Sequence, residues 1–206
     1  MKRKFIKAFT LIFTLILFSA QVFAATTIYT VKYGDTMWKI ASRYQVGISE
    51  IISANPQVRN ASMIYPGQKL NIPSISDVAA IEAQVVKLVN QQRAAAGLQP
   101  LKQNWQLSRV ARYKSQDMIN KNYFSHQSPT YGSPFNMMES FGLRFSAAGE
   151  NIAMGQRTAA EVMNAWMNSS GHRANILNPS YTEIGVGLAK SSSGVCYWTQ
   201  QFMKPM

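Results

Sequence analysis

The side chains best suited to chemistry in this sequence are two histidines and one glutamate. His126 and His172 are the only histidines in the 206 residues, and Glu150 lies between them in the chain. Two neutral imidazoles and a carboxylate, with water in an open position, would suit Zn²⁺. The same three groups could instead act as general base and general acid. The spacings are long, and no compact metal motif such as HExxH supports the metal interpretation.

A structural role for both histidines also stays open. His126 follows two aromatic residues at an expected helix end, and His172 stands at an expected helix start, so each could satisfy nearby backbone groups. Ser128 lies close to a histidine, but no Gly-x-Ser-x-Gly turn exists to activate it. Cys196, the only cysteine, lies in an apolar run that indicates a buried, inert thiol, and it excludes an internal disulfide.

The elements that must position these residues are predicted over 79–206. Apolar residues at helical spacing indicate one helix that ends at Gly97 and a second helix over 106–121. Thr158 begins a capping box that opens a further helix. Strand-like segments on both sides of 191–194 predict an antiparallel hairpin. Helices that cover a small sheet are typical of an α+β layered domain.

Residues 28–73 form a much smaller unit. A strand, two short helices and a closing strand are expected, in the order βααβ. Asp35 or Thr36 can cap the first helix, and Pro56 stops the second. Trp38 on the first helix is predicted to be a core residue, with a sugar-binding platform as the alternative.

The first 24 residues predict a cleaved export signal. Four basic residues precede an apolar run, and Val22-Phe23-Ala24 supplies the small-residue cleavage pattern. The run is shorter than the ~20 residues of a membrane-spanning helix, so no transmembrane span is expected after cleavage. A short polar linker is expected at 74–78.

Loss of the export signal lowers the formal net charge from +12 to +8, because residues 1–24 carry four basic residues and no acid. The remaining surplus is spread over both units. A diffuse basic surface fits a polyanionic wall or a membrane surface as well as nucleic acid, or it serves solubility alone. Because the chain is expected to be exported, a nucleic-acid partner is not predicted.

The first unit resembles a lysin-motif (LysM) domain, a module that binds glycans containing N-acetylglucosamine. The resemblance is carried by "YTVKYGDTMWKIASRYQVGISEIISANP" and "IYPGQKLNIP", which together span the whole unit. It implies a glycan groove between the loop after the first strand and the loop before the last. Carried over residue by residue, the implied groove residues are Gly34, Asp35, Thr36 and Met37 on one wall, and Pro56, Met63 and Ile64 on the other.

The second unit resembles the CAP superfamily (cysteine-rich secretory proteins, antigen 5 and pathogenesis-related proteins) in its bacterial form. Four segments carry the resemblance: "NYFSHQSP", "AAGENIA", "AWMNSSGHRANILNP" and "TEIGVGLA" with "YWTQQF". It implies an α-β-α sandwich with a cleft that contains His126, Glu150 and His172 and that holds a divalent metal in some members. The second glutamate of the animal members has no counterpart, since Asn168 and Ser169 follow Trp166 here.

These observations predict a secreted protein of the cell wall or spore coat. Its LysM module is expected to bind peptidoglycan or another N-acetylglucosamine polymer, and its CAP domain to bind a ligand or partner such as a coat protein, a wall protein or a lipid. One alternative is a wall-tethered hydrolase, a peptidase or glycan-cleaving enzyme, that uses His126, Glu150 and His172 with or without Zn²⁺ at the two histidines. The other alternative, a lipid carrier, follows from the resemblance alone.

Overall fold

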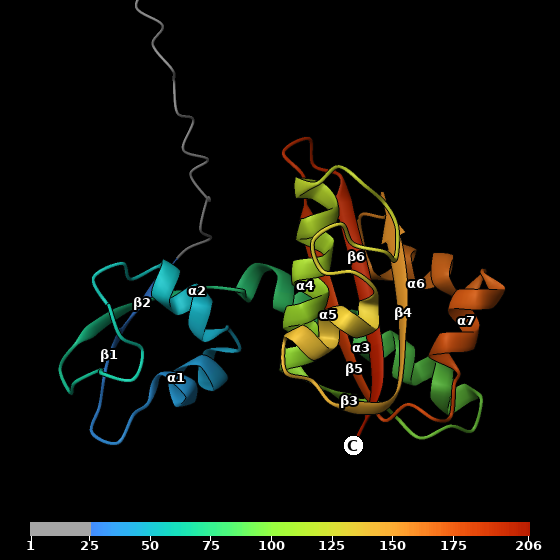
Figure 1. The fold of residues 1–206 in the computed structure, drawn as a ribbon. Helices are drawn as coiled ribbons and strands as arrows, with labels where there is room; N and C mark the ends of the chain where they lie inside the picture. Colours follow the sequence, from blue (N-terminus) through green and yellow to red (C-terminus); the bar gives the residue numbers. More distant parts are fainter. Residues whose placement is uncertain (1–25) are drawn as a thin grey trace, which may run out of the picture.

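The computed structural model describes residues 26–206, so the predicted export signal at 1–24 lies outside the described residues. The described chain forms a small unit and a larger unit that lie beside each other (Figure 1). Their helices and strands, in chain order, are β1 (Thr26–Thr30), α1 (Met37–Tyr44), α2 (Ile48–Ser53), β2 (Lys69–Pro73), α3 (Ser76–Ala95), β3 (Lys102–Gln103), α4 (Trp105–Asn120), α5 (Pro134–Ser140), β4 (Phe145–Met154), α6 (Ala159–Met167), α7 (Ser170–Ile176), β5 (Glu183–Lys190) and β6 (Cys196–Pro205).

The small unit has the predicted βααβ order. β1 and β2 pair antiparallel, and the two helices pack on them around a core that includes Ile40, Ile51 and Leu70. Thr36 rather than Asp35 caps α1, because its hydroxyl accepts a hydrogen bond from the backbone N–H of Lys39 at 3.2 Å.

The prediction that Trp38 is a core residue is wrong. Its side chain was expected in the core, but 53% of its surface is exposed. The apolar face of α1 is made instead by Met37, Ile40 and Ala41, which are all buried. Trp38 directly follows Met37, and neighbouring positions on a helix point about 100° apart, so the indole is directed away from the core.

The large unit is built on a four-stranded sheet with the strand order β3-β5-β6-β4. The predicted hairpin is present, since β5 and β6 pair antiparallel on either side of the turn at 191–194. β4, for which no strand was predicted, pairs with β6 alone and forms one edge of the sheet. This edge strand contains Glu150.

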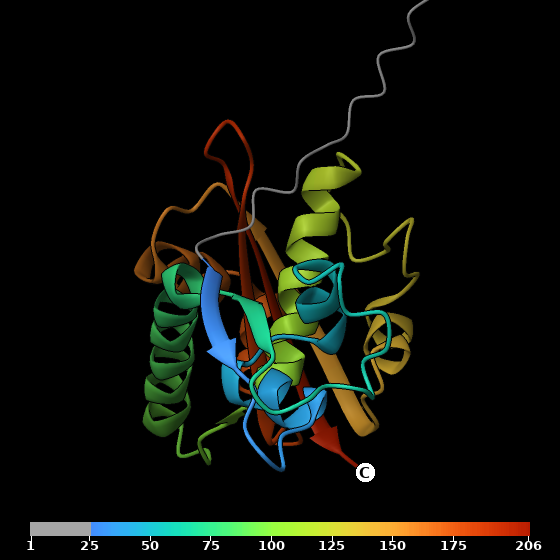
Figure 2. The ribbon, with the colours of Figure 1, turned by 90° about the vertical axis from the view of Figure 1, so that its left-hand side faces the viewer.

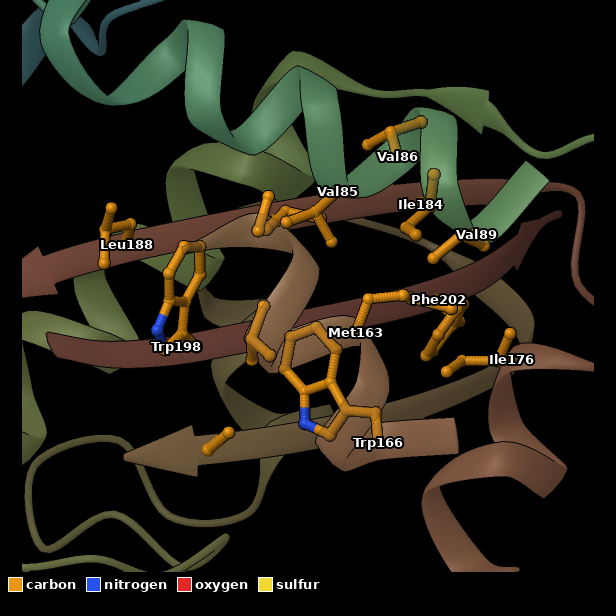
Figure 3. Packing of buried hydrophobic residues seen from close by; sticks show 14 of the residues in the cluster. Val85, Val86, Val89, Met163, Trp166, Ile176, Ile184, Leu188, Trp198 and Phe202 are labelled. Carbon is orange, nitrogen blue, oxygen red and sulfur yellow. The ribbon is translucent and has the colours of Figure 1, made fainter. Parts of the chain in front are cut away.

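Helices cover both faces of this sheet, which confirms the predicted α-β-α sandwich. Helices α4 and α5 pack against one face, and α3, α6 and α7 pack against the other (Figure 1). On the second face the buried indoles of Trp166 and Trp198 lie among aliphatic side chains of α3 and the strands (Figure 3). Cys196 is buried in the same core, as expected.

Two glycines of β5 let α4 approach the sheet closely. A Cβ atom at Gly185 would overlap the backbone of Leu107 and Ser108, and one at Gly187 would overlap that of Ala111 and Arg112. Helix α4 therefore has a fixed position on the sheet. Its C-terminal end leads into the segment that carries His126.

The connector between the units is shorter than the predicted linker at 74–78. Helix α3 begins at Ser76, so Asp77 lies in its first turn, where a carboxylate favours the helix dipole, and does not cap it. Only Ser74 and Ile75 separate β2 from α3. Within residues 26–206, no helix is both long and apolar enough to cross a membrane.

The two units touch through side chains of α2 and α4. The Glu50 carboxylate accepts hydrogen bonds from the Arg109 guanidinium at 2.8 to 3.2 Å and also from the Tyr113 hydroxyl. In the view that brings the small unit to the front, it lies over the large unit, with α2 and its loops in front of α4 (Figure 2). The side chains of Glu50 and Arg109 are only 20% and 21% exposed, so this ion pair is shielded from solvent.

Candidate functional sites

The small unit has a groove of about 350 Å³ between the β1–α1 loop and the segment before β2. Aliphatic, aromatic and hydroxyl side chains line it together, a mixture that suits a ligand with both apolar and polar faces. The lining residues are Asp35, Thr36, Met37, Trp38, Ile48, Ala61, Ser62 and Ile64.

Asp35 gives the groove loop its shape. Its carboxylate accepts hydrogen bonds from the Tyr29 hydroxyl at 2.6 Å and from the backbone N–H of Lys32 at 2.8 Å. The Tyr29 hydroxyl, followed by the Lys32 N–H, holds the pKa of Asp35 below its usual value. Gly34 has φ +79°, the left-handed region that glycine adopts without strain, which completes the turn.

The structure brings together four of the seven residues expected from the LysM resemblance. Asp35, Thr36, Met37 and Ile64 line the groove, and Gly34 lies in the turn beside it without lining it.

The other two residues lie elsewhere. Met63 lines a separate hollow with Arg59 and Tyr65, on the other side of the same segment, and Pro56 is exposed and lines neither hollow. Met63 and Ile64, although adjacent in the chain, therefore face different hollows.

Sequence reasoning missed four lining residues. Ile48, Ala61 and Ser62 line the groove without having been expected there, and Trp38 was assigned to the core. Ile48 immediately follows Gly47 at the start of α2, a position that the helix prediction could have flagged. The short 61–62 segment carries no pattern that reveals its orientation.

The second candidate site lies at the β4 edge of the large sheet, where His126 contacts Glu150. The Nδ1 atom of His126 lies 2.8 Å from Oε1 of Glu150. The Glu150 side chain is 2% exposed and the His126 side chain is 52% exposed. A carboxylate that accepts from Nδ1–H favours the tautomer in which Nε2 carries the lone pair.

Glu150 is fixed from several directions. Its second oxygen, Oε2, accepts a hydrogen bond from Nε2 of Gln201 on β6 at 3.1 Å. Its backbone carbonyl accepts one from the Asn175 amide on α7 at 3.2 Å. The carboxylate therefore orients the imidazole, an arrangement that leaves His126 able to take a proton at Nε2.

Lys114, which is fully buried on α4, binds the backbone of the segment that carries His126. Its ammonium donates to the carbonyl oxygens of Ser125 and His126, both at 2.8 Å, and to the Tyr123 hydroxyl at 3.2 Å. Burial lowers the pKa of Lys114, while the nearby Glu150 and Asp117 carboxylates oppose that shift.

Asp117, one turn further along α4, anchors the same segment. Its carboxylate accepts from the hydroxyls of Tyr123, Ser128 and Thr130 at 2.6 to 2.7 Å. Burial raises its pKa, but these hydrogen bonds outweigh burial and lower it below the usual value. Side-chain hydrogen bonds from α4 therefore fix the loop that carries His126.

His172 lies near this pair, on α7. Its side chain is partly buried, and burial together with the charge of nearby His126 lowers its pKa below that of a free histidine. Its backbone carbonyl accepts a hydrogen bond from the Asn151 amide at 3.0 Å, which ties α7 to β4.

The three expected residues thus lie in one region of the large unit. Among residues 26–206, no three His, Cys, Asp or Glu side chains are grouped so that they could hold a metal ion. Glu150, the expected third ligand, is already hydrogen bonded to the ring of His126 and to Gln201. His126 and His172 are the two residues predicted to bind a divalent metal, and this metal site stays a prediction.

Comparison with known proteins agrees with this two-part organisation. Residues 29–73 match the LysM domain, and residues 86–202 match the cysteine-rich secretory protein family, abbreviated CAP. A crystal structure of an extracellular protein containing an SCP domain, from Bacillus anthracis strain Ames, has a TM-score of 0.57 and 35% identity. The match covers 61% of this chain and 41% of that one.

Three relatives illustrate the range of similar proteins. The chain is 60% identical over 128 residues to the uncharacterized protein YkwD of Bacillus subtilis, covering 62% of this chain and 49% of YkwD. It is 32% identical over 186 residues to the uncharacterized membrane protein YlbC of the same species, covering 85% of this chain and 52% of YlbC. A shorter match, 38% identical over 82 residues, covers 36% of this chain and 13% of the spore coat assembly protein ExsA of Bacillus cereus.

The chain thus spans about half the length of YkwD and YlbC. The family match, by contrast, covers more than half of this chain. It includes the edge strand with Glu150 and the segments with both histidines. The chain therefore belongs to the cysteine-rich secretory protein (CAP) family, with a LysM domain ahead of its CAP domain.

Proposed function

We propose that this is a secreted protein of the cell wall or spore coat that binds peptidoglycan, or another N-acetylglucosamine polymer, through the groove of its LysM domain. The groove lined by Thr36, Met37 and Ile64, within a segment that matches the LysM domain, carries this proposal. The CAP domain is then held at the glycan, where it presents the His126–Glu150 pair to a ligand or partner.

The chemistry of the groove suits an amino sugar. Trp38 and Ile64 offer apolar surface to the acetamide methyl and to the C–H faces of the sugar ring. Thr36 and Ser62 offer hydroxyl groups that can donate to or accept from the sugar hydroxyls and the acetamide. Apolar lining with a few polar groups is the usual composition of a small-ligand site.

Location outside the cell is supported by the predicted export signal, by the extracellular SCP-domain protein among the structural relatives, and by the coat assembly protein among the sequence relatives. Both a cell wall and a spore coat are compatible with these observations. Fractionation of cells and spores, followed by detection with an antibody, distinguishes the two locations.

The proposal is tested by sedimentation of the mature chain with purified, insoluble peptidoglycan. Ile64→Asp places a charge in the groove and should abolish sedimentation. Met63→Asp is the matched control, because Met63 is the adjacent residue but lines a different hollow. Equal sedimentation of the two variants would contradict the groove as the binding site.

A hydrolase is the second candidate, and the His126–Glu150 geometry favours it. A buried carboxylate that orients an accessible imidazole is the arrangement of a general base. Incubation with muropeptides should then give turnover that His126→Ala removes, and retained turnover in that variant would exclude this role for His126. A lipid-carrier role stays a prediction from the sequence resemblance.

A further inference from the structure

The contact between the two domains lies directly beside the glycan groove. Trp38 on α1 and Ile48 at the start of α2 both line the groove. The same two helices contact α4 of the CAP domain, where Trp38 meets Trp105 and Glu50 meets Arg109. One end of the groove therefore borders on a surface of the second domain.

The Glu50–Arg109 ion pair fixes the geometry of the contact between the two domains. Arg109 donates to Glu50 through Nε and Nη2 and to the hydroxyl of Ser49 at 3.0 Å. Its guanidinium also lies over the rings of Tyr113 and Phe141, at 5.3 and 5.0 Å from their centroids. Planar contacts of this kind fix the orientation of the guanidinium as well as its position.

Gly47 allows the close approach. A Cβ atom at this position would overlap the side chains of Glu50 and Arg109. Because the overlapped atoms are the ends of these two side chains, a larger residue would displace the ion pair from its present geometry. The ion pair and this glycine together hold the groove at the domain border.

At this border the two indoles form one aromatic surface. The ring centroids of Trp38 and Trp105 are 5.9 Å apart, and their planes are inclined by 47°. Trp38 is 53% exposed, and Trp105 is partly exposed. Sugar rings pack well on such surfaces, because their C–H groups carry a positive partial charge and the face of an indole is negative.

We propose that Trp105 extends the glycan site, so that a polymer occupying the LysM groove continues over Trp38 onto the CAP domain. The inference rests on the proposed function, since it takes the groove to be the place where the glycan binds. The occupant is the same N-acetylglucosamine polymer, because the indole surface is continuous with the groove through Trp38. Both domains then hold one glycan strand.

This arrangement makes affinity depend on the length of the glycan. An oligomer held within the groove does not contact Trp105, because Trp105 is not among the residues that line it. A longer oligomer contacts both domains and gains the stacking energy of an additional aromatic residue. The CAP domain is thereby aligned along the polymer and does not swing freely beside it.

The test uses the mature chain, residues 25–206, and isothermal titration calorimetry with the trimer and the hexamer of N-acetylglucosamine. Trp105→Ala should weaken hexamer binding about two- to tenfold, the value of one aromatic contact, and leave trimer binding unchanged. Trp105→Phe should retain part of the preference for the hexamer. Phe135→Ala is the matched control, because Phe135 is an exposed aromatic residue of the CAP domain paired with Phe145.

Direct contact is checked by the indole N–H resonance of Trp105 in ¹⁵N-labelled protein, which should shift with the hexamer and stay in place with the trimer. The inference is overturned if Trp105→Ala weakens both oligomers equally or neither of them. Failure of the unchanged chain to bind either oligomer would instead contradict the proposed function of the groove.

Discussion

At the scale of single residues, the CAP site depends on a buried carboxylate with both oxygens occupied. Glu150 holds His126 through one oxygen and is held by Gln201 through the other. Lys114 fixes the backbone on which His126 stands. The nitrogen of His126 that does not contact Glu150 is Nε2, and the partly buried His172 lies near this ring.

The titration of His172 is the prediction at this scale. Burial and the nearby His126 lower its pKa, so its ring should titrate below pH 6.5 in NMR spectra of the folded chain. His126→Ala removes the imidazole whose repulsion, after burial, is the second cause of the shift, and it should raise the pKa of His172. An unchanged pKa in that variant would contradict the proximity of the two rings.

The same shift has a consequence for stability. The folded state disfavours the protonated form of His172, so the unfolded state binds more protons between the two pKa values. The free energy of unfolding should therefore decrease as the pH falls from about 6.5 through the lower pKa of the folded chain. His172→Gln should flatten this part of the pH profile.

At the scale of helices and strands, the close packing of α4 on β5 positions the site. Most elements follow from the sequence, since the α4 helix, the Thr158 cap and the C-terminal hairpin carry the expected periodicity or cap. β4 was not predicted, because Ser146-Ala-Ala-Gly149, which follows its first residue, lacks the β-branched and aromatic residues typical of strands. It is a strand because it pairs along its length with β6.

The glycine contacts of β5 give the prediction at this scale. Gly187→Ala would drive a methyl group into the backbone of Ala111 and Arg112, where no side chain can move aside. Overpacking of this kind costs about 1–3 kcal/mol or more, so the melting temperature should fall by several degrees. Calorimetry measures this change.

Gly171→Ala is the control for that experiment. Gly171 lies in α7, and a Cβ atom there meets open space. The melting temperature of the Gly171→Ala variant should be unchanged or slightly raised, since alanine favours a helix. A similar decrease in both variants would show that the α4–β5 approach is not the cause.

At the scale of the whole molecule, two domains share one shielded ion pair and one pair of indoles. The sequence predicts each domain, together with His126, Glu150, His172 and most of one groove wall. It could not predict the domain contact, because Glu50 and Arg109 are 59 residues apart and lie in different domains, so no local pattern links them. For the same reason the exposure of Trp38 at the domain border was missed.

Disruption of that ion pair should uncouple the domains. Burial raises the pKa of Glu50, but hydrogen bonds from Arg109 and Tyr113 outweigh burial and lower it. The contribution of ionised Glu50 to the free energy of unfolding is therefore fully present above pH 4.5, the usual pKa of a glutamate. It should be lost as the pH falls through the lower pKa of Glu50 in the folded state. Glu50→Gln should split thermal unfolding into two calorimetric transitions at pH 7, with the LysM domain melting first.

The hydroxyl of Tyr113 reports on the same contact. Burial, followed by the hydrogen bond to Glu50, raises its pKa to about 12. Ultraviolet titration should show this tyrosine ionising at a lower pH in Glu50→Gln. Glu139→Gln, at an exposed position of α5, should change neither the titration nor the unfolding profile.

A groove for amino sugars, and not the net positive charge of the chain, is expected to attach the protein to the wall. Sedimentation of the mature chain with purified peptidoglycan, measured across a salt series with and without soluble N-acetylglucosamine hexamer, tests this most directly. The hexamer should release the chain into the supernatant. Salt should have little effect, because salt screens attraction between exposed charges and the groove binds its glycan through uncharged contacts. Release by salt alone, with the hexamer without effect, would contradict the account.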